Sequence, residues 1–288
     1  MNASPMSDDL SALAWVYEEV KKSLETAQKS LQRCLKETGT PGFSDVDAVD
    51  PAVLRTARQQ IHQAVGALEL AGLTGGAMVL RASEALVQRY VNRPQAVDEE
   101  GVKAIESTSF ALLDFMRRRM AGKPISIMAL FPQYETLTEL SGAELARPSD
   151  LWVQEWPAVS LEVSLVSPAD AKAREAGQDT LAEFETSLLA LLRSGQPAEA
   201  APLVGLCSDL AAGATARQAH REAATWVLAS GFLQAIAEQR LSITVHVKRV
   251  LSGLLSQLRT LARGRALLSE RLSHELLFFC AQASPAAA

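Results

Sequence analysis

Apolar residues recur through most of the chain at every third or fourth position, the spacing that gathers them on one face of an α-helix. Strict alternation of apolar and polar residues, which is typical of a half-buried strand, is almost absent. Over the first half of the chain this pattern predicts four amphipathic helices. Their expected ranges are about 10–36, 51–71, 78–90 and 98–120.

Glycines and the apolar spacing define how these four helices should end and pack. Gly72 and the pair Gly75-Gly76 are expected to close the second helix and turn the chain. Phe110 is expected on the buried face of the fourth helix. Because the connections are short, we predict that residues 1–122 form an up-and-down four-helix bundle.

The composition changes between residues 123 and 158. This stretch is enriched in proline and tryptophan and contains an apolar patch at 125–131, so we predict a docked linker that is partly helical around 132–140. Helical spacing then predicts a second bundle over residues 159–282, and residues 283–288 have the composition of a linker to a further part of a longer protein. The expected fold class is therefore all-α, with two helical bundles in tandem. The helices expected in the second bundle span about 160–175, 179–194, 197–212, 214–238, 243–263 and 266–281.

Charge and cysteine usage limit the classes of function. A formal net charge of −5 and a pI near 5.5 argue against a nucleic-acid binder, which needs a basic surface to replace the counterions on phosphates. Partners are therefore expected to be proteins. The three cysteines lie far apart without metal-ligand spacing, which indicates free thiols in a reducing compartment. With no signal segment and no apolar run of ~20 residues, we expect a cytoplasmic protein that makes no membrane contact.

The sequence contains no motif for a nucleotide, a metal or another cofactor. The glycines at 72–76 lack the Gly-Lys-Ser/Thr ending of a phosphate-binding loop. The four histidines are too dispersed to form a metal cluster, and spacing alone assigns no Ser/His/Asp set. We therefore expect no cofactor and no catalytic activity that the chain performs by itself.

His62 occupies an informative position on the second predicted helix. At about 100° per residue, the apolar residues of this helix fall in one sector, and His62 points roughly a quarter-turn away from its centre. It shares a polar strip with Arg58 and Gly66. An accessible imidazole can attack a phosphoryl group near neutral pH, and Gly66 would let a partner approach the backbone closely. Glu84, on the next helix, can accept a hydrogen bond from the far ring nitrogen. The alternative is an ordinary surface histidine.

A family resemblance favours the first interpretation. Residues 62–87 resemble the histidine phosphotransfer (Hpt) domain of CheA-type chemotaxis kinases, and the match needs no insertion or deletion. The resemblance is carried by His-Gln-Ala-Val-Gly-Ala-Leu at 62–68 and Ser-Glu-Ala-Leu-Val at 83–87. The resemblance implies that His62 is phosphorylated, that Gly66 admits the partner and that Glu84 orients the ring.

One position departs from the family pattern. The family usually has a lysine three residues after the histidine, where it helps with the charge of the phosphoryl group, and this chain has Val65. Arg58, one turn earlier, and Arg81, on the facing helix, are the candidate cations in its place.

A wider resemblance covers most of the chain. It is carried by Leu-Ala-Trp-Val-Tyr-Glu-Glu-Val from residue 13, the segment Arg58–Leu73, Leu-Phe-Pro-Gln-Tyr from residue 130, Trp226, and Val-Lys-Arg-Val-Leu from residue 247. These segments resemble the N-terminal region of ChpA/PilL-like hybrid chemosensory kinases of type IV pili, a region also found alone as FimL-like regulators. The resemblance implies a cytoplasmic role in signalling or scaffolding.

Two further histidines have competing interpretations. The sequence Ala-Arg-Gln-Ala-His220 echoes the segment before His62, which indicates a degenerate Hpt-like repeat, but no glycine follows one turn later. We interpret His220 as a structural histidine near the edge of the core. His246 lies in a basic stripe that is either a solvated helix face or a docking surface for an acidic partner. The cations of this stripe are Lys248, Arg249, Arg259, Arg263 and Arg265.

The leading hypothesis is a phosphotransfer-like signalling module for type IV pili and twitching motility. In it, His62 takes a phosphoryl group from a histidine kinase core or a response-regulator receiver domain. The alternative is a non-catalytic FimL-like scaffold that holds pilus-signalling proteins through the same bundles. A generic helical-repeat adaptor is disfavoured, because no period of about 33–47 residues recurs.

Overall fold

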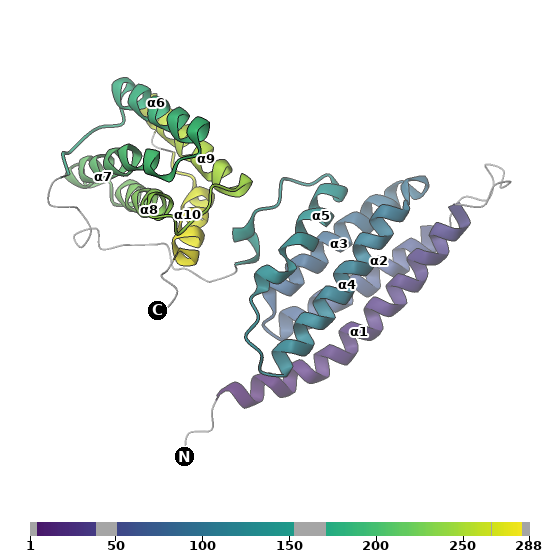
Figure 1. The fold of residues 1–288 in the computed structure, drawn as a ribbon. Coiled ribbons are helices and arrows are strands. Elements are labelled where there is room, and N and C mark those ends of the chain that lie inside the picture. The colour runs from purple at the N-terminus through teal and green to yellow at the C-terminus, as the bar shows by residue number, and fades with distance from the viewer. Residues whose placement is uncertain (1–4, 39–50, 153–170, 266, 284–288) are drawn as a thin grey trace, which may run out of the picture. The chain divides into compact units, whose positions relative to one another are not determined.

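The computed structural model describes residues 5–38, 51–152, 171–265 and 267–283. Within these ranges the chain forms ten α-helices and several short 3-10 turns, without a strand. It divides into two compact units, Met1–Val153 and Gln154–Ala288 (Figure 1). The predicted all-α fold with helical bundles in tandem is confirmed.

Four long helices form the frame of the first unit. Neighbours along the chain pack side by side, and the fourth helix also packs against the first, which closes a four-helix bundle (Figure 1). Three residues join the second helix to the third, so these two run antiparallel. The helices are α1 (Pro5–Thr38), α2 (Pro51–Leu70), α3 (Thr74–Asn92) and α4 (Glu99–Met120).

The turn between α2 and α3 depends on Gly72. This residue has φ +70°, a left-handed conformation that glycine adopts at little cost. The Gly72 N–H donates to the carbonyl of Glu69 at 3.0 Å, and the Leu73 N–H donates to that of Leu68 at 2.8 Å. These are the two hydrogen bonds of a Schellman motif. Leu73 is buried, so the turn is also held to the core.

Gly75 and Gly76 do not turn the chain as predicted; they lie buried in the first turn of α3. A Cβ on Gly75 would lie 2.6 Å from Cγ1 of Ile127 and 3.1 Å from the carbonyl oxygen of Leu151. A Cβ on Gly76 would lie 3.2 Å from a methyl group of Leu112. The glycines are therefore needed for close packing, which the local sequence does not reveal.

The prediction that Phe110 is buried is wrong, because its side chain is 62% exposed. Two polar residues occupy core positions of α4 in its place. The hydroxyls of Thr108 and Ser109 donate to the carbonyls of Ala104 and Ile105 at 2.8 and 2.9 Å. These bonds satisfy the buried hydroxyls, so the buried face of α4 is partly polar.

Residues 123–152 belong to the first unit and pack on its four-helix bundle, against α3 and α4. Leu130 and Leu137 are buried there, and the Arg89 guanidinium of α3 donates to the carbonyl of Leu140 near the end of a fifth helix. Residues 153–158 of the predicted linker lie outside the described ranges. The segment contains η2 (Ile127–Leu130), α5 (Phe131–Ser141) and η3 (Pro148–Leu151).

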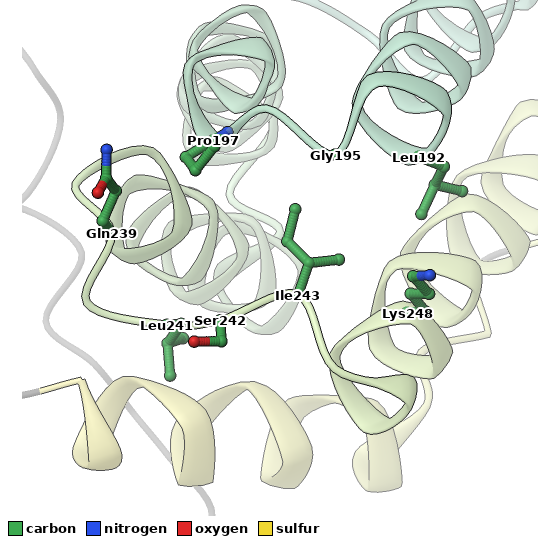
Figure 2. Close-up of a pocket in the computed structure, with 8 residues that line it drawn as sticks. All are labelled: Leu192, Gly195, Pro197, Gln239, Leu241, Ser242, Ile243 and Lys248. Atoms are coloured by element: carbon green, nitrogen blue, oxygen red, sulfur yellow. The ribbon is translucent and has the colours of Figure 1, made fainter.

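The described part of the second unit contains five shorter helices around a core that includes Phe184, Trp226 and Phe232, all fully buried. The helix Gln178–Ser194 packs against the helices Ala201–Ala216 and Val245–Ala262. The helix His220–Ala237 packs against the helices Ala201–Ala216 and Glu270–Gln282. Figure 2 shows the turns in which Gly195 and Gln239 end two helices, with φ 64° and 60°. The elements are α6 (Gln178–Ser194), η5 (Pro197–Ala200), α7 (Ala201–Ala216), α8 (His220–Ala237), α9 (Val245–Ala262) and α10 (Glu270–Gln282).

Residues 171–177 are an extended strap instead of the end of a helix, which corrects the prediction for 160–175; residues 160–170 lie outside the described ranges. The Lys172 N–H donates to Oδ1 of Asp209 at 2.9 Å, and the Arg174 N–H donates to the carbonyl of Asp209 at 3.0 Å. The strap can cross α7 closely because Gly213 has no side chain there.

The helix predicted for 214–238 is also corrected. The first predicted residues belong to α7, which continues to Ala216, and α8 begins only at His220. Gln218 takes a left-handed conformation with φ 60°, and the Ala219 N–H donates to the carbonyl of Ala214 at 2.9 Å. No glycine marks this turn, so the sequence gives little sign of it.

Substituting Gly213 by Ala should destabilise the second unit, because the new Cβ would lie 2.0 Å from the carbonyl oxygen of Arg174. We expect the free energy of unfolding to fall by about 1–3 kcal/mol. Urea denaturation of the full chain, followed by circular dichroism and tryptophan fluorescence, measures it.

Gly205→Ala is the matched control on the same helix, because a Cβ there meets nothing within 4 Å. Its higher helix propensity should stabilise the protein by about 0.5–1 kcal/mol. Equal effects of the two substitutions would contradict the position of the strap.

Candidate functional site

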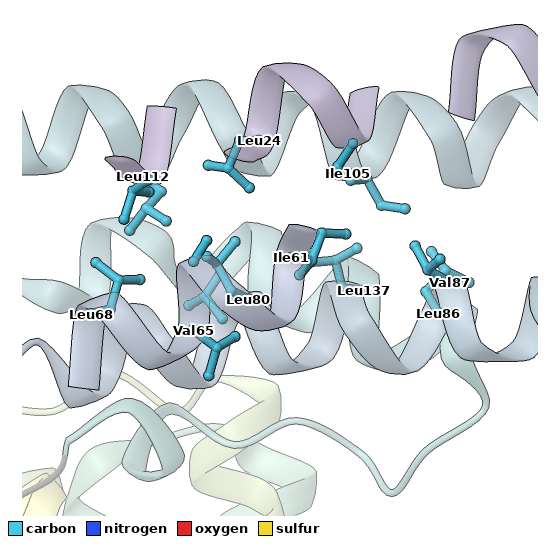
Figure 3. Packing of buried hydrophobic residues seen from close by; sticks show 14 of the residues in the cluster. Leu24, Ile61, Val65, Leu68, Leu80, Leu86, Val87, Ile105, Leu112 and Leu137 are labelled. Carbon is cyan, nitrogen blue, oxygen red and sulfur yellow. The ribbon is translucent and has the colours of Figure 1, made fainter. Parts of the chain in front are cut away.

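The rotation of α2 about its axis decides which side chains reach the surface. Ile61 and Val65 point into the core, toward side chains from the neighbouring helices (Figure 3). His62 is displaced by one residue from this buried stripe, and its side chain is 69% exposed. The imidazole is therefore open to a partner molecule.

Glu84 of α3 lies beside the imidazole. Nδ1 of His62 is 3.2 Å from the carboxylate oxygens of Glu84, whose side chain is 21% exposed. When Nδ1 donates its proton to this carboxylate, the neutral ring carries its lone pair on Nε2. The pair therefore places a nucleophilic nitrogen on the exposed side of the ring.

Two arginines flank the pair, and each has a partner. Nε of Arg58 lies 3.8 Å from Oε1 of Glu84, and its guanidinium also donates to the side-chain oxygen of Gln88. The Arg81 guanidinium donates to the carboxylate of Glu69, which lies two turns after His62. Both guanidinium groups are about half exposed, so each can exchange its present partner for another anion.

The surface next to His62 is open along α2. A Cβ on Gly66 would meet nothing within 4 Å, so packing within this chain does not require glycine there. Leu70, one further turn along, is 90% exposed. His62, Gly66 and Leu70 thus form a stripe at four-residue spacing in which an exposed imidazole is followed by an open position and an apolar side chain.

The positive charge beside His62 comes from Arg58 and Arg81, each of which lies next to a glutamate of the same face. Position 65 does not add to the cations, because Val65 is 3% exposed and belongs to the core. The arginines around His62 are therefore the local source of positive charge.

Sequence reasoning did not single out Gln88, Glu69 or Leu70. Gln88 follows Glu84 by four residues and Leu70 follows Gly66 by four, so helical spacing alone could have added both to the polar strip. The pairing of Glu69 with Arg81 depends on the register between two helices, which spacing along one helix does not determine.

His220 does not lie at the edge of the core as predicted. It is the first residue of α8, and it is exposed although Ala223 and Trp226 on the same helix are buried.

Some side chains of the basic stripe, which begins on α9 and continues past its end, already make contacts within the chain. Arg259 donates to the carboxylate of Glu185 at 2.7 and 3.0 Å, and Nδ1 of the half-buried His246 lies 3.5 Å from the guanidinium of Arg249. Lys248, Arg263 and Arg265 are exposed.

Other chemistry is limited in the part of the chain that the structure describes. There, three or more His, Cys, Asp or Glu side chains nowhere come together to hold a metal ion, and none of the helices combines the length and apolar character needed to cross a membrane. Cys34 and Cys207 are buried free thiols. Burial raises the pKa of Cys207, and raises that of the Cys280 thiol to about 11, so these thiols stay protonated.

Comparison with known families gives a match within the second unit. Residues 169–288 match a family model described as the second domain of the FimL scaffold protein. The matched range begins just before the strap over α7 and includes the five helices that the structure describes in this unit. No curated protein and no solved structure matches the chain.

Glu84 should set the tautomer of His62. In the full chain we expect neutral His62 to carry its proton mainly on Nδ1, because the Glu84 carboxylate accepts it. The Glu84→Ala substitution should shift the proton toward Nε2, which nitrogen-15 NMR of the imidazole measures.

Glu69→Ala is the matched control, because Glu69 pairs with Arg81 instead of the imidazole. The tautomer of His62 should remain the same in this variant. An unchanged tautomer in Glu84→Ala would show that the contact does not orient the ring.

Proposed function

We propose that this chain is a signalling scaffold in the regulation of type IV pili, and that it holds other signalling proteins. The match of residues 169–288 to the second domain of the FimL scaffold protein carries the proposal. The fold supports it, because two helical units in one chain offer separate surfaces for different partners. The wider sequence resemblance to the N-terminal region of the pilus chemosensory kinases points to the same pathway.

The proposed partners are a histidine kinase core and a response-regulator receiver domain. The face around His62 suits an acidic partner, because the half-exposed Arg58 and Arg81 can exchange their glutamate partners for another carboxylate. Leu70 adds an exposed apolar side chain to this face, and apolar contacts surrounded by polar groups are typical of protein interfaces. A partner can dock here without any phosphoryl group.

Loss of the chain should impair twitching motility in the organism that encodes it. Under the scaffold proposal, a His62→Gln variant should restore twitching as well as the unchanged protein does, because the exposed imidazole adds little to folding. The measurement is the diameter of twitching zones in a deletion strain complemented with each variant.

His220→Gln is the matched control, since it makes the same change at another exposed histidine. A deletion strain with normal twitching would remove the scaffold from this pathway. Failure of His62→Gln together with success of His220→Gln would favour the second candidate function.

The second candidate is histidine phosphotransfer, which the contact between His62 and Glu84 favours. In this reaction Nε2 attacks the phosphorus of a donor, either the γ-phosphate of ATP held by a kinase core or the acyl phosphate of a receiver domain. A nitrogen–phosphorus bond forms while the bond to the leaving oxygen breaks. The proton on Nδ1 stays on the ring and is donated in a hydrogen bond to Glu84, whose carboxylate stabilises the positive charge of the ring. Arg58 or Arg81 can approach the phosphoryl oxygens.

Incubation of the full chain with the cognate kinase core and radiolabelled ATP tests phosphotransfer. We expect a label on His62 that is lost in acid and stable in base, as phosphohistidine is. His220→Gln should be labelled normally and His62→Gln should not. Complete absence of label with all cognate kinases would remove this candidate and leave the scaffold proposal in place.

A further inference from the structure

The second unit contains a cavity of about 460 Å³ at the place where α6 ends and α9 begins (Figure 2). Its walls combine aliphatic and polar groups in similar measure, with Leu192, Pro197 and Ile243 among the lining residues. Gln239 lies at one side, and the ammonium group of Lys248 lies at the other, next to Leu192 (Figure 2). We call this cavity and its rim the α6–α9 groove.

The walls of the α6–α9 groove are held by the ends of the helices. Gln239 ends α8 in a left-handed conformation, and Thr244 begins α9 by accepting a hydrogen bond from the Val247 N–H at 3.3 Å. The loop between these two caps carries Ile243, whose half-buried side chain points into the space between the chain turns (Figure 2). The groove is therefore preformed, and a ligand would not need to order it.

Apolar surface continues beyond the cavity along both bordering helices. Leu189 lies three residues before Leu192 on α6 and is 50% exposed. Val245 lies three residues before Lys248 on α9 and is 58% exposed. Side chains three residues apart share a helix face, so both extend the groove outward. An elongated segment fits this surface better than a compact molecule, because it can cover the rim as well as fill the cavity.

The charges at the groove favour an acidic occupant. Lys248 makes no ion pair with any side chain that the structure describes. Arg193, beside Leu192, is exposed, while the nearby Glu238 is already paired with Arg240 at 2.9 Å. A carboxylate entering the groove would therefore meet unneutralised positive charge.

We infer that the α6–α9 groove binds an acidic amphipathic segment of a partner protein. Aliphatic side chains of that segment enter between Leu192, Pro197 and Ile243, and one of its carboxylates pairs with Lys248. Helical segments with apolar anchors use preformed grooves of this kind, and the volume lies within the usual range for binding pockets. The inference deepens the scaffold proposal and rests on it for the premise that the ligand is a protein.

Selection from a random peptide library displayed on phage, with the purified full chain as target, tests the inference. We expect the enriched peptides to combine aliphatic residues with Asp or Glu. A synthetic peptide of the enriched sequence should bind Lys248→Glu and Ile243→Asp about tenfold more weakly than the unchanged chain, as measured by fluorescence anisotropy. Replacing the acidic residue of the peptide by Lys should restore binding to Lys248→Glu.

Lys123→Glu is the matched control, because it makes the same charge change at an exposed lysine of the first unit. It should bind the peptide normally, and circular dichroism should show that all variants are folded. Peptides that bind every variant alike, or peptides without acidic and aliphatic residues, would overturn the inference. Self-association of the chain that Lys248→Glu abolishes would assign the groove to a second copy and would also overturn it. Because the assay measures direct binding, it is independent of the twitching assay for the scaffold proposal.

Discussion

The burial of one face of α2 is the constraint on which the candidate site depends. Ile61 and Val65 lie in the core of the first unit, and burying such side chains stabilises a fold by about 1.5–3 kcal/mol each. Their burial determines the rotation of α2, and successive side chains on a helix differ by about 100°. His62, next to Ile61, must then lie outside the buried face. The exposure of the imidazole is therefore a consequence of core packing.

The position of Glu84 follows from a second set of constraints. The Schellman turn at Gly72 and the buried Leu73 set where α3 begins, and the burial of Ser83 and Leu86 sets its rotation. Glu84 then lies at the edge of the core, where its carboxylate reaches Nδ1 of His62. The contact thus depends on a backbone turn about three helical turns away, so a change in that turn would separate the pair without altering either residue.

Regular features of this fold could be predicted from the sequence, whereas features that depend on distant contacts could not. The buried stripe of α2 is visible in the sequence because burial repeats with the helical period. Gly75 is required by Ile127 and Leu151, which are far away along the chain, so its local sequence suggested a turn. Gln218 ends α7 without the usual glycine. At the candidate site, the contact between His62 and Glu84 was expected from a family resemblance, because spacing along one helix does not determine the register with the next.

Scaffolding and phosphotransfer would use the same face of the first unit, and the ion pairs there explain how. Arg58 and Arg81 now hold Glu84 and Glu69, but pairs between exposed side chains contribute only about 0–1 kcal/mol. An acidic partner can therefore recruit either guanidinium at little cost, whether or not it carries a phosphoryl group. Val65 supplies no cation to this face, but its burial strengthens the core that keeps the face rigid. A face with weakly held cations on a rigid helix pair can therefore bind acidic partners without any phosphoryl transfer, as the scaffold proposal requires.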